Sequence, residues 1–370
     1  MESLHISPKK QDIFLLITTL LLVIFGTAMV YSSSGIMAMD RFHDGQYFLK
    51  KQIFFVVLGL GLMFLFLQIP YQKLKIFAYP AIIIAFVMLL LLFVPFLGRR
   101  VGGAVRWLNL GFISFQVGEL VKVSLVLFLA FFLSRKRHHI KELFHGIALP
   151  LGITACLMGL IILQPDFGTT AIIAVTTMIM LYLAGARILH LASLVAIFTP
   201  FAVWALCHGY RWERLMTFLN PWSDPRGSGF QIIQSMISFG AGGTFGVGLG
   251  NGMQKLFYLP EPHTDFILAV IAEEGGFIGV SIVMGLYIVF IIRGFIISFK
   301  APDLFGMLLA AGFTLLFALQ IFINSAGVMG LVPLKGLTLP FLSYGGSSLL
   351  MSFAMVGVLL SISSQENKGP

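Results

Sequence analysis

Long apolar stretches alternate with short polar ones along almost the whole chain. A window of about twenty predominantly apolar residues is long enough to cross a bilayer as an α-helix. The pattern therefore predicts ten membrane-spanning helices, at residues 12–33, 48–69, 74–96, 117–134, 145–163, 168–185, 188–208, 265–293, 303–325 and 342–363. The eighth window is long enough for its helix to tilt or to begin outside the hydrocarbon. Because ten is even, both chain ends are predicted on the same side of the membrane.

The segments between the apolar windows are unequal. Three of them, residues 97–116, 209–264 and 326–341, hold most of the glycine, proline, tryptophan and charge outside the predicted helices. All three lie on the side opposite the chain ends, whereas the connections on the other side are short. Segment 209–264 is too long for a plain linker. We therefore expect the functional residues on the side of the three long connections.

Segment 209–264 contains two patterns typical of helices at a membrane surface. Residues 211–222 mix tryptophan and phenylalanine with Arg211 and Arg214, which suits an interfacial helix. After Ser228, apolar residues recur at helical spacing between glutamines and serines, which predicts an amphipathic helix with the apolar positions Phe230, Ile232, Ile233, Met236 and Ile237. The glycine-rich residues 240–252 lack the ending and spacing of phosphate-binding loops, so they predict a flexible or re-entrant loop.

Composition supports a membrane protein. Hydrophobic residues make up 58% of the chain, charged residues 11%, and the mean hydropathy is +0.97. Soluble proteins carry about a quarter charged residues, so these values exclude an ordinary soluble domain. Cys156 and Cys207 lie inside apolar windows and are expected to pack there rather than to form a disulfide framework or a metal cluster. No repeat divides the chain, so residues 1–370 are predicted to form one integral membrane domain.

The distribution of lysine and arginine predicts the orientation. Once the long 209–264 segment is discounted, basic residues are more frequent on the side of the chain ends, so both termini are predicted to be cytoplasmic. The opposite side still keeps many basic residues, although this is the disfavoured side for them. Their retention there suggests an anionic ligand, and contact with lipid headgroups is the alternative.

Carboxylates gather in one stretch, residues 259–279. It contains Glu261, Asp265, Glu273 and Glu274 in a chain with only 15 acidic residues. Ionisable groups at the edge of the hydrocarbon are costly, so the stretch is a candidate functional site. For Asp265 the alternative is a cap at the start of the eighth helix. For Glu273 the alternatives are a polar shaft into the membrane and a hydrogen bond between helices.

Other polar residues lie within or beside the spans. Glu119 and Lys122 are three residues apart on one helix face, which predicts an ion pair. Asp166 follows a break at Gln164-Pro165 and is a candidate helix cap or site residue. Gln320 and Asn324 are four apart and are predicted to bond neighbouring helices.

Five segments together resemble the SEDS family (shape, elongation, division and sporulation). They are GGAVRWLNLGFISFQVGELVK, QPDFGTT, RWERLMTFLNPWSDPRGSGFQIIQS, YLPEPHTDFILAVIAEE and KGLTLPFLSYGGSS. The resemblance covers nearly the whole chain. The NPWSDPRGSG and KGLTLPFLSYGGSS segments are more similar to the division-type FtsW branch than to the elongation-type RodA branch. Two departures, Val117-Gly118 for the usual Pro-Ser and Gly275 for the usual Leu, affect the start of the fourth helix and the packing of the eighth.

The resemblance implies a fold and an activity. Family members are peptidoglycan glycosyltransferases of ten transmembrane helices that polymerise lipid II on the outer face of the bacterial cytoplasmic (inner) membrane, here for septal wall synthesis in division. The all-α polytopic fold would carry interfacial helices in the long outward loop between helices 7 and 8. Lipid II carries a pyrophosphate, so cationic residues would line its cavity. The candidates are Arg106, Arg211, Arg214, Lys255 and Lys335.

The resemblance also implies roles for individual residues. Asp265, in the HTDF motif, matches the essential acidic residue and is expected to act as general base or as ligand of a divalent cation, Mg²⁺ or Mn²⁺. Trp107 is expected either to stack on a sugar or to anchor the chain at the interface. His263 and Ser343 complete the candidate substrate-binding set, and the pair Glu119 and Lys122 matches the family's paired acidic and basic residues.

Partners follow from the same resemblance. The chain has no room for a transpeptidase fold, so a membrane-anchored class B penicillin-binding protein is the expected partner, together with other membrane proteins of the division or elongation complex. No nucleic acid partner is expected. Three other functions stay open at this stage: a lipid II flippase or transporter, an elongation-type polymerase and a scaffold without activity. The short inner connections and the lack of a visible inverted repeat disfavour the transporter.

Overall fold

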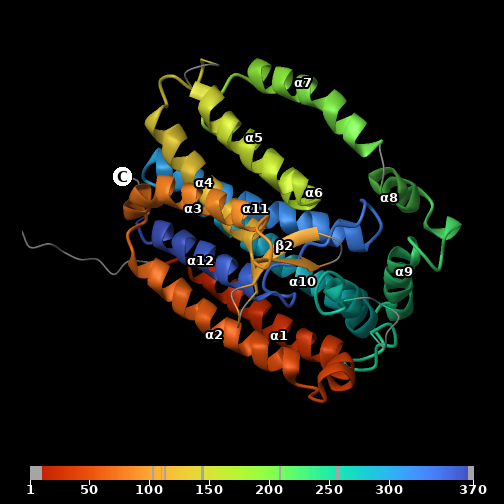
Figure 1. Ribbon diagram of the computed structural model, residues 1–370. Coiled ribbons are helices and arrows are strands. Elements are labelled where there is room, and N and C mark those ends of the chain that lie inside the picture. Colours follow the sequence, from red (N-terminus) through yellow and green to blue (C-terminus); the bar gives the residue numbers. More distant parts are fainter. Residues whose placement is uncertain are drawn as a thin grey trace, which may run out of the picture.

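A computed structural model gives the structure of the protein (Figure 1). It describes residues 11–101, 104–109, 111, 114–142, 146–207, 210–255, 259 and 261–365, without the side chains of residues 100, 101, 104, 201, 202, 204–206, 210 and 211. The elements are α1 (Ile13–Phe42), α2 (Tyr47–Gln68), η1 (Tyr71–Phe77), α3 (Ala78–Leu91), β1 (Gly98–Val101), β2 (Ala104–Asn109), β3 (Ser114–Gln116), α4 (Val117–Arg135), α5 (Ala148–Leu163), α6 (Phe167–Leu183), α7 (Ile188–Leu206), α8 (Tyr210–Leu219), η3 (Pro221–Ser223), α9 (Phe230–Gly242), α10 (Ile267–Phe299), α11 (Leu304–Val328) and α12 (Gly346–Ser363).

Every predicted span coincides with a helix. Within the described part of the chain, seven helical segments are long and apolar enough to cross a membrane, and α5, α6 and α7 are shorter apolar helices. The structure thus confirms a multi-pass helical protein, while the count of ten spans stays a prediction. The largest shift of a helix end is at α1, which continues to Phe42, because the predicted window ended where serines begin to interrupt the apolar run.

Helices α4, α11 and α12 form the centre of the molecule. Their apolar windows are 72%, 72% and 83% buried, whereas those of α2, α3 and α10 are 17%, 28% and 28% buried. The outer helices therefore direct most of their apolar surface outward, as expected of helices that face lipid. Helix α7 stands apart at one edge (Figure 1) and exposes Ile188, Leu189, Ile197 and Phe198. Cys156 and Cys207 are also exposed, so the prediction that they pack inside the protein is wrong.

A small sheet departs from the all-helical prediction. Strands β1, β2 and β3 are antiparallel in that order and occupy the long connection at residues 97–116, for which the sequence predicted no strands. In β2, Trp107 pairs with Arg99 of β1 and with Gln116 of β3. The first residue of α4 directly follows β3, and the Gln116 N–H donates to the Ser347 hydroxyl at 3.0 Å. The sheet is thereby fixed on the ends of α4 and α12.

Helix α10 is broken at Gly276, where φ is 62° and ψ is −162°. The glycine-rich loop supplies the hydrogen bonds that the break removes. Val247 and Gly248 N–H groups donate at 3.0 and 3.1 Å to the carbonyls of residues 273 and 274, and the N–H groups of residues 277 and 278 donate to the carbonyls of residues 243 and 244. Backbone groups at membrane depth must be satisfied within the protein. The loop is therefore the backbone partner of a broken helix.

Helices α8 and α9 confirm the two helices predicted in the long segment. The buried side of α9 differs from the predicted apolar stripe, because Ser235 and Ser238 are buried and Met236 and Ile237 are exposed. The Ser235 hydroxyl donates to the Val328 carbonyl at the end of α11 at 2.6 Å. Small polar residues allow close helix packing, while the larger apolar ones can face lipid.

The two described chain ends lie together, at the end of the bundle opposite the sheet. Asp12 caps α1, its N–H donates to the Ser363 hydroxyl of α12 at 3.1 Å, and its carboxylate pairs with Arg293 of α10. The described ends of the chain therefore lie at the same end of the bundle, and the side of the membrane on which the termini lie stays a prediction. Lys9, Lys10 and Lys368, which contributed to the predicted orientation, lie outside the described residues.

Candidate functional site

The turn before α10 is held through its main chain. The successive carbonyls of residues 263–265 accept hydrogen bonds from the Tyr344 N–H at 2.8 Å, the Ser343 hydroxyl at 2.6 Å and the Asn324 amide at 3.0 Å. The donors come from α11 and from the segment between α11 and α12. Three consecutive anchors fix the backbone, so the side chain of Asp265 is not needed to hold the turn.

The Asp265 carboxylate points toward the segment before α12. Its Oδ2 lies 3.0 Å from the position that a Cβ on Gly336 would occupy, so the lack of a side chain at 336 makes room for it. The carboxylate does not cap α10, whose N-cap is Phe266 without a side-chain hydrogen bond, so the capping alternative is wrong. Burial and the charge of Glu261 together raise the pKa of Asp265 to about 7, against the opposing effect of the Arg106 guanidinium.

Arg106 projects from β2 toward the start of α6. Its Nη2 donates to the Pro165 carbonyl at 2.7 Å, and its Nε lies 3.6 Å from the Asp166 carboxylate. This Nε is buried without a hydrogen-bond partner among the described residues. Asp166 also caps α6 by accepting from the N–H and hydroxyl of Thr169 at 3.2 and 2.9 Å. The cap that the sequence predicted for Asp166 is therefore confirmed, and the same carboxylate faces Arg106.

Lys335 joins this group from the segment before α12. Its Nζ lies 5.8 Å from the centre of the Phe167 ring, and its Cβ packs on Gly168 in the first turn of α6. The next residue, Gly336, contacts Asp265. The structure therefore brings Asp265, Arg106 and Lys335 together where β2, the start of α6 and the turn before α10 converge.

His263 is the first of the three anchored residues of the turn. It is buried, its ring packs 4.4 Å from that of Phe48 and 5.6 Å from that of Tyr344, and its Nδ1 has no hydrogen-bond partner among the described residues. Burial, assisted by the positive charge of Arg41, lowers the pKa of His263 to about 4. His263 is therefore neutral at physiological pH, although its Nε2 lies 3.7 Å from Glu261.

The predicted ion pair in α4 is confirmed. Lys122 Nζ lies 2.9 Å from Glu119 Oε1, and both side chains are buried. Lys122 also donates to Gln320 at 2.8 Å, and Gln320 donates to the Thr338 carbonyl at 2.8 Å. Gln320 thus bonds the neighbouring helix α4, as predicted. Asn324 instead donates to the carbonyls of Asp265 and Leu337, which lie outside the helices. The network links α4 and α11 to the segment that carries Lys335 and Gly336.

Lys255, predicted as a wall of the substrate cavity, lies in a buried ion pair. Its Nζ is 2.5 Å from Glu274 Oε1 and 3.1 Å from the Ser32 hydroxyl. Ser32 of α1 also donates to Glu274 at 2.8 Å. Glu273 accepts from the Met253 and Gln254 N–H groups at 2.7 and 3.2 Å. Glu274 therefore fastens both the long loop and α1 to α10. Glu273 bonds the main chain of the loop, which is neither the polar shaft nor the hydrogen bond between helices that the sequence suggested.

The remaining candidates lie in different places. Trp107 is half-buried in β2. The Ser343 hydroxyl is buried and occupied by the Thr264 carbonyl. Arg214 is exposed on α8, which stands away from the sheet at the edge of the molecule (Figure 1), and the side chain of Arg211 lies outside the described residues. The structure does not bring α8 to Asp265.

The sequence left Asp166 as either a helix cap or a site residue, and it did not point to Gly336 at all. The signal for Asp166 was present, because a Gln-Pro-Asp break between two apolar windows places a carboxylate at the edge of the membrane. Gly336 gave no such signal, since its contact with Asp265 joins residues far apart in the chain.

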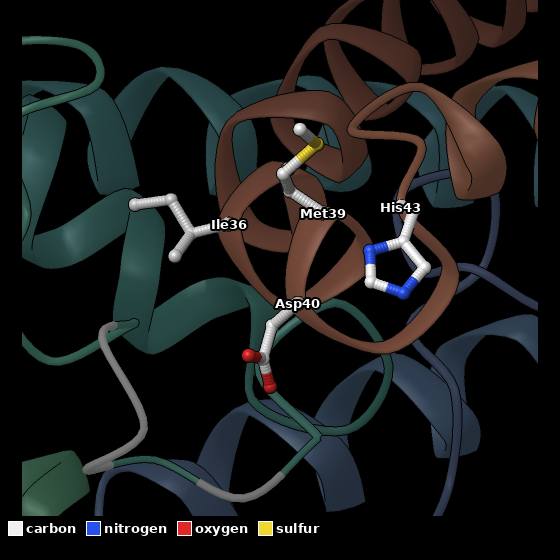
Figure 2. Close-up of a pocket in the computed structure, with 5 residues that line it drawn as sticks. Ile36, Met39, Asp40 and His43 are labelled. Carbon is white, nitrogen blue, oxygen red and sulfur yellow. The ribbon is translucent and has the colours of Figure 1, made fainter.

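A separate surface hollow of about 510 Å³ lies at the end of α1. It is lined by Gly35, Ile36, Met39, Asp40 and His43, and Figure 2 shows the four larger side chains arranged around the last turns of that helix. None of these residues belongs to the group around Asp265.

A divalent cation at the turn would need carboxylate ligands. Among the described residues, no group of three or more His, Cys, Asp or Glu side chains could hold a metal ion. Mg²⁺ is commonly bound by one or two carboxylates together with substrate phosphates and water. Asp265, with no other role in holding the turn, fits a cation of that kind.

Comparison with known proteins identifies the family. The family described as cell cycle protein, whose model combines FtsW, RodA and SpoVE, matches residues 12–368. A relative from Trichlorobacter lovleyi named probable peptidoglycan glycosyltransferase FtsW is 45% identical over 96% of this chain and 93% of its own. Stage V sporulation protein E of Bacillus subtilis is 43% identical over 96% of this chain and 97% of its own.

Solved structures agree with the sequence comparison. One, described as the structural coordination of polymerization and crosslinking by a peptidoglycan synthase complex, has a TM-score of 0.80 and 32% identity over 97% of this chain and 99% of that chain. The rod shape determining protein RodA of Thermus thermophilus has a TM-score of 0.71 and 27% identity over 97% of this chain and 98% of that chain. The chain therefore belongs to the FtsW, RodA and SpoVE family of cell cycle proteins.

Proposed function

We propose that the protein is a peptidoglycan glycosyltransferase that polymerises lipid II, with Asp265 as its catalytic residue. The names of its relatives support the activity. The observation that carries the assignment to Asp265 is its setting: a carboxylate with a pKa of about 7, on a turn held by other residues, beside the cations Arg106 and Lys335. A general base works best when its pKa lies near the working pH.

The reaction joins two disaccharide units of lipid II. The acceptor hydroxyl oxygen attacks the anomeric carbon of the donor, and the bond from that carbon to the pyrophosphate breaks. The Asp265 carboxylate takes the hydroxyl proton, on the side opposite the leaving group, as in an inverting transfer. The pyrophosphate is negatively charged both in the bound donor and after it leaves, and Arg106 and Lys335 can bind it in both states.

Asp265 is also the residue that would hold a divalent cation, Mg²⁺ or Mn²⁺. Such a cation would neutralise the pyrophosphate when bound. The two roles make different demands, because a ligand must stay deprotonated whereas a base must change its protonation during the reaction.

We place the protein in the bacterial inner membrane, with both termini in the cytoplasm and the Asp265 site on the outer side. A class B penicillin-binding protein is the proposed partner, because a structural relative is described as a complex that coordinates polymerization and crosslinking. The relatives named FtsW support a role in septal wall synthesis.

A gel assay for glycan strands, with purified protein, lipid II, divalent cation and the partner, tests the proposal. The wild type should form polymer and Asp265→Ala should form none. Asp44→Ala is the matched control, because Asp44 is an acid in a surface pair with Lys50, and it should polymerise normally. Polymer from Asp265→Ala at the wild-type rate would refute the role of Asp265. Headgroup movement across sealed vesicles without chain growth would support a lipid II transporter instead.

A further inference from the structure

The Asp166 carboxylate makes two kinds of contact, one with the first turn of α6 and one with Arg106. Its carboxylate satisfies the first turn of α6 through Thr169, and any good capping residue could do that. It also faces the buried Nε of Arg106 at 3.6 Å. The second contact is specific to a charged carboxylate, because a neutral cap would provide no charge for the guanidinium.

Arg106 is held by two contacts at the start of α6. The Pro165 carbonyl accepts its Nη2 at 2.7 Å, and Asp166 lies beside its Nε. Both contacts come from the two residues that precede α6, so the guanidinium is fixed relative to that helix end. The Arg106 side chain is 27% exposed, so it is not fully enclosed by these contacts.

The start of α6 is connected to Asp265 through one short segment. Gly168 packs on Lys335 and Leu337, and Gly336 between them contacts the Asp265 carboxylate. The charged groups that face this site are Asp166 from α6, Arg106 from β2, Lys335 from the segment before α12, and Glu261 with Asp265 on the turn. Asp166 alone among these acids lies next to the arginine guanidinium.

We propose that Asp166 is a positioning residue for glycosyl transfer, which holds the Arg106 guanidinium at the site so that it meets the pyrophosphate of the lipid-linked donor. The proposal rests on the proposed function. An arginine side chain loses considerable freedom when it is ordered, and a fixed guanidinium binds an anion with less loss of entropy on binding. Asp166 itself does not touch the reacting atoms.

Two substitutions distinguish the negative charge of Asp166 from its role as the cap of α6. Asp166→Asn keeps a good helix cap and removes the charge. We expect its KM for lipid II to rise about tenfold, with kcat within about twofold of the wild type, since uniform binding is lost. Thr169→Val removes one capping contact of the same carboxylate and keeps the charge. It should lower thermal stability slightly and leave KM unchanged.

A double-mutant cycle decides whether Asp166 acts through Arg106. Once Arg106→Gln has removed the guanidinium, Asp166→Asn should raise KM no further, and KM should fall slightly because a negative charge near the anion has been removed. Equal increases in KM in both backgrounds would mean that Asp166 serves only the helix, and would overturn the proposal. If Asp166→Asn does not fold, Asp166→Ser provides another neutral cap for the same cycle.

Binding of lipid II in the presence of EDTA gives a readout that needs neither turnover nor a metal ion. The dissociation constant should follow the same pattern as KM across the four proteins of the cycle. A wild type that binds lipid II without polymerising it would contradict the proposed function and leave the cycle readable. Binding that is unchanged by Asp166→Asn would contradict the role of Asp166 alone.

Discussion

The ionisation of Asp265 gives a direct test at the scale of one residue. If Asp265 is the general base, its carboxylate form is active, and burial together with Glu261 raises its pKa to about 7. The polymerisation rate should therefore fall as the pH is lowered through about 7 and level off above about 8. Initial rates between pH 5 and 9, at saturating lipid II and fixed cation concentration, would measure this.

Glu261 supplies the control for that profile. Its side chain is 60% exposed and its charge raises the pKa of Asp265. Glu261→Gln should therefore move the acid limb of the profile to lower pH while the plateau rate is kept. An unmoved limb would mean that another group sets the pH dependence.

The raised pKa of Asp265 also means that this residue lowers the stability of the folded protein at neutral pH. At pH 5 the folded protein keeps a proton on Asp265 that the unfolded chain, with a usual pKa near 3.8, has released. The folded state binds more protons, so this group's contribution to stability falls as pH rises from about 4 to 7. Asp265→Asn removes the penalty. It should raise Tm by ~2–4 °C at pH 7.5 while it abolishes polymerisation.

Differential scanning fluorimetry at pH 5 and pH 7.5 would measure the shift. The gain in Tm should be smaller at pH 5, where the wild-type carboxyl is already neutral. A lower Tm for Asp265→Asn would show that the residue stabilises the fold.

Substitutions in the buried pair of Lys255 and Glu274 should lower the stability of the protein, in contrast to Asp265→Asn. Removing one partner of a buried pair leaves the other charge without compensation, which costs about 3–5 kcal/mol. Lys255→Met and Glu274→Gln should each destabilise the protein strongly, and the double variant should recover much of the loss. Unfolding in detergent would measure all three, and additive losses would contradict the pairing.

At the scale of elements, the break in α10 depends on glycine at two facing positions. Gly276 has φ of 62° and Gly246 has φ of 81°, and a Cβ on either would collide with main-chain atoms of the other segment. Gly246→Ala and Gly276→Ala should each lose about 3 kcal/mol or more, because strain and collision act together. Thermal unfolding in detergent micelles would show the loss as a lower Tm.

The same helix offers a matched control. Gly285 lies in α10 beyond the break, and a Cβ there would meet nothing within 4 Å. Gly285→Ala should be neutral or stabilise the helix by ~0.5–1 kcal/mol. Equal losses at Gly285 and Gly276 would mean that the break has no special demand for glycine.

What the sequence could predict differs between these elements. The apolar windows were reliable because a membrane span is defined by local composition, and α2, α4 and α6 begin within a residue of the predicted positions. The sheet was missed because the short strands β1 to β3 are stabilised by pairing and by contact with α12. The break at Gly276 was missed because its hydrogen-bond partners lie about thirty residues earlier in the chain.

The candidate site also combines residues that the sequence predicted with residues that only tertiary contacts reveal. Asp265 was identified through a motif, and its position on a held turn fits that prediction. Lys255 looked equivalent to the other basic residues outside the spans, and only the tertiary contact with Glu274 distinguishes it. Arg106 and Lys335 meet Asp265 because three distant segments converge, which a single sequence does not reveal.

At the scale of the whole molecule, orientation decides whether the Asp265 site faces lipid II on the outer side. Arg226, between η3 and α9, is exposed and belongs to the same long segment that precedes Asp265. Arg137, just after α4, is exposed at the other end of the bundle, among the basic residues that predict the cytoplasmic side.

A cysteine at either position reports the side that it occupies. Cys156 and Cys207 are exposed and must first be replaced by alanine. In intact spheroplasts, a membrane-impermeant maleimide should label Arg226→Cys and leave Arg137→Cys unlabelled until the membrane is opened. The reverse pattern would place the Asp265 carboxylate in the cytoplasm. Glycan strands made there would be on the wrong side of the membrane for the wall, so this single result would remove the basis for the proposed polymerase even if the chemistry at Asp265 were intact.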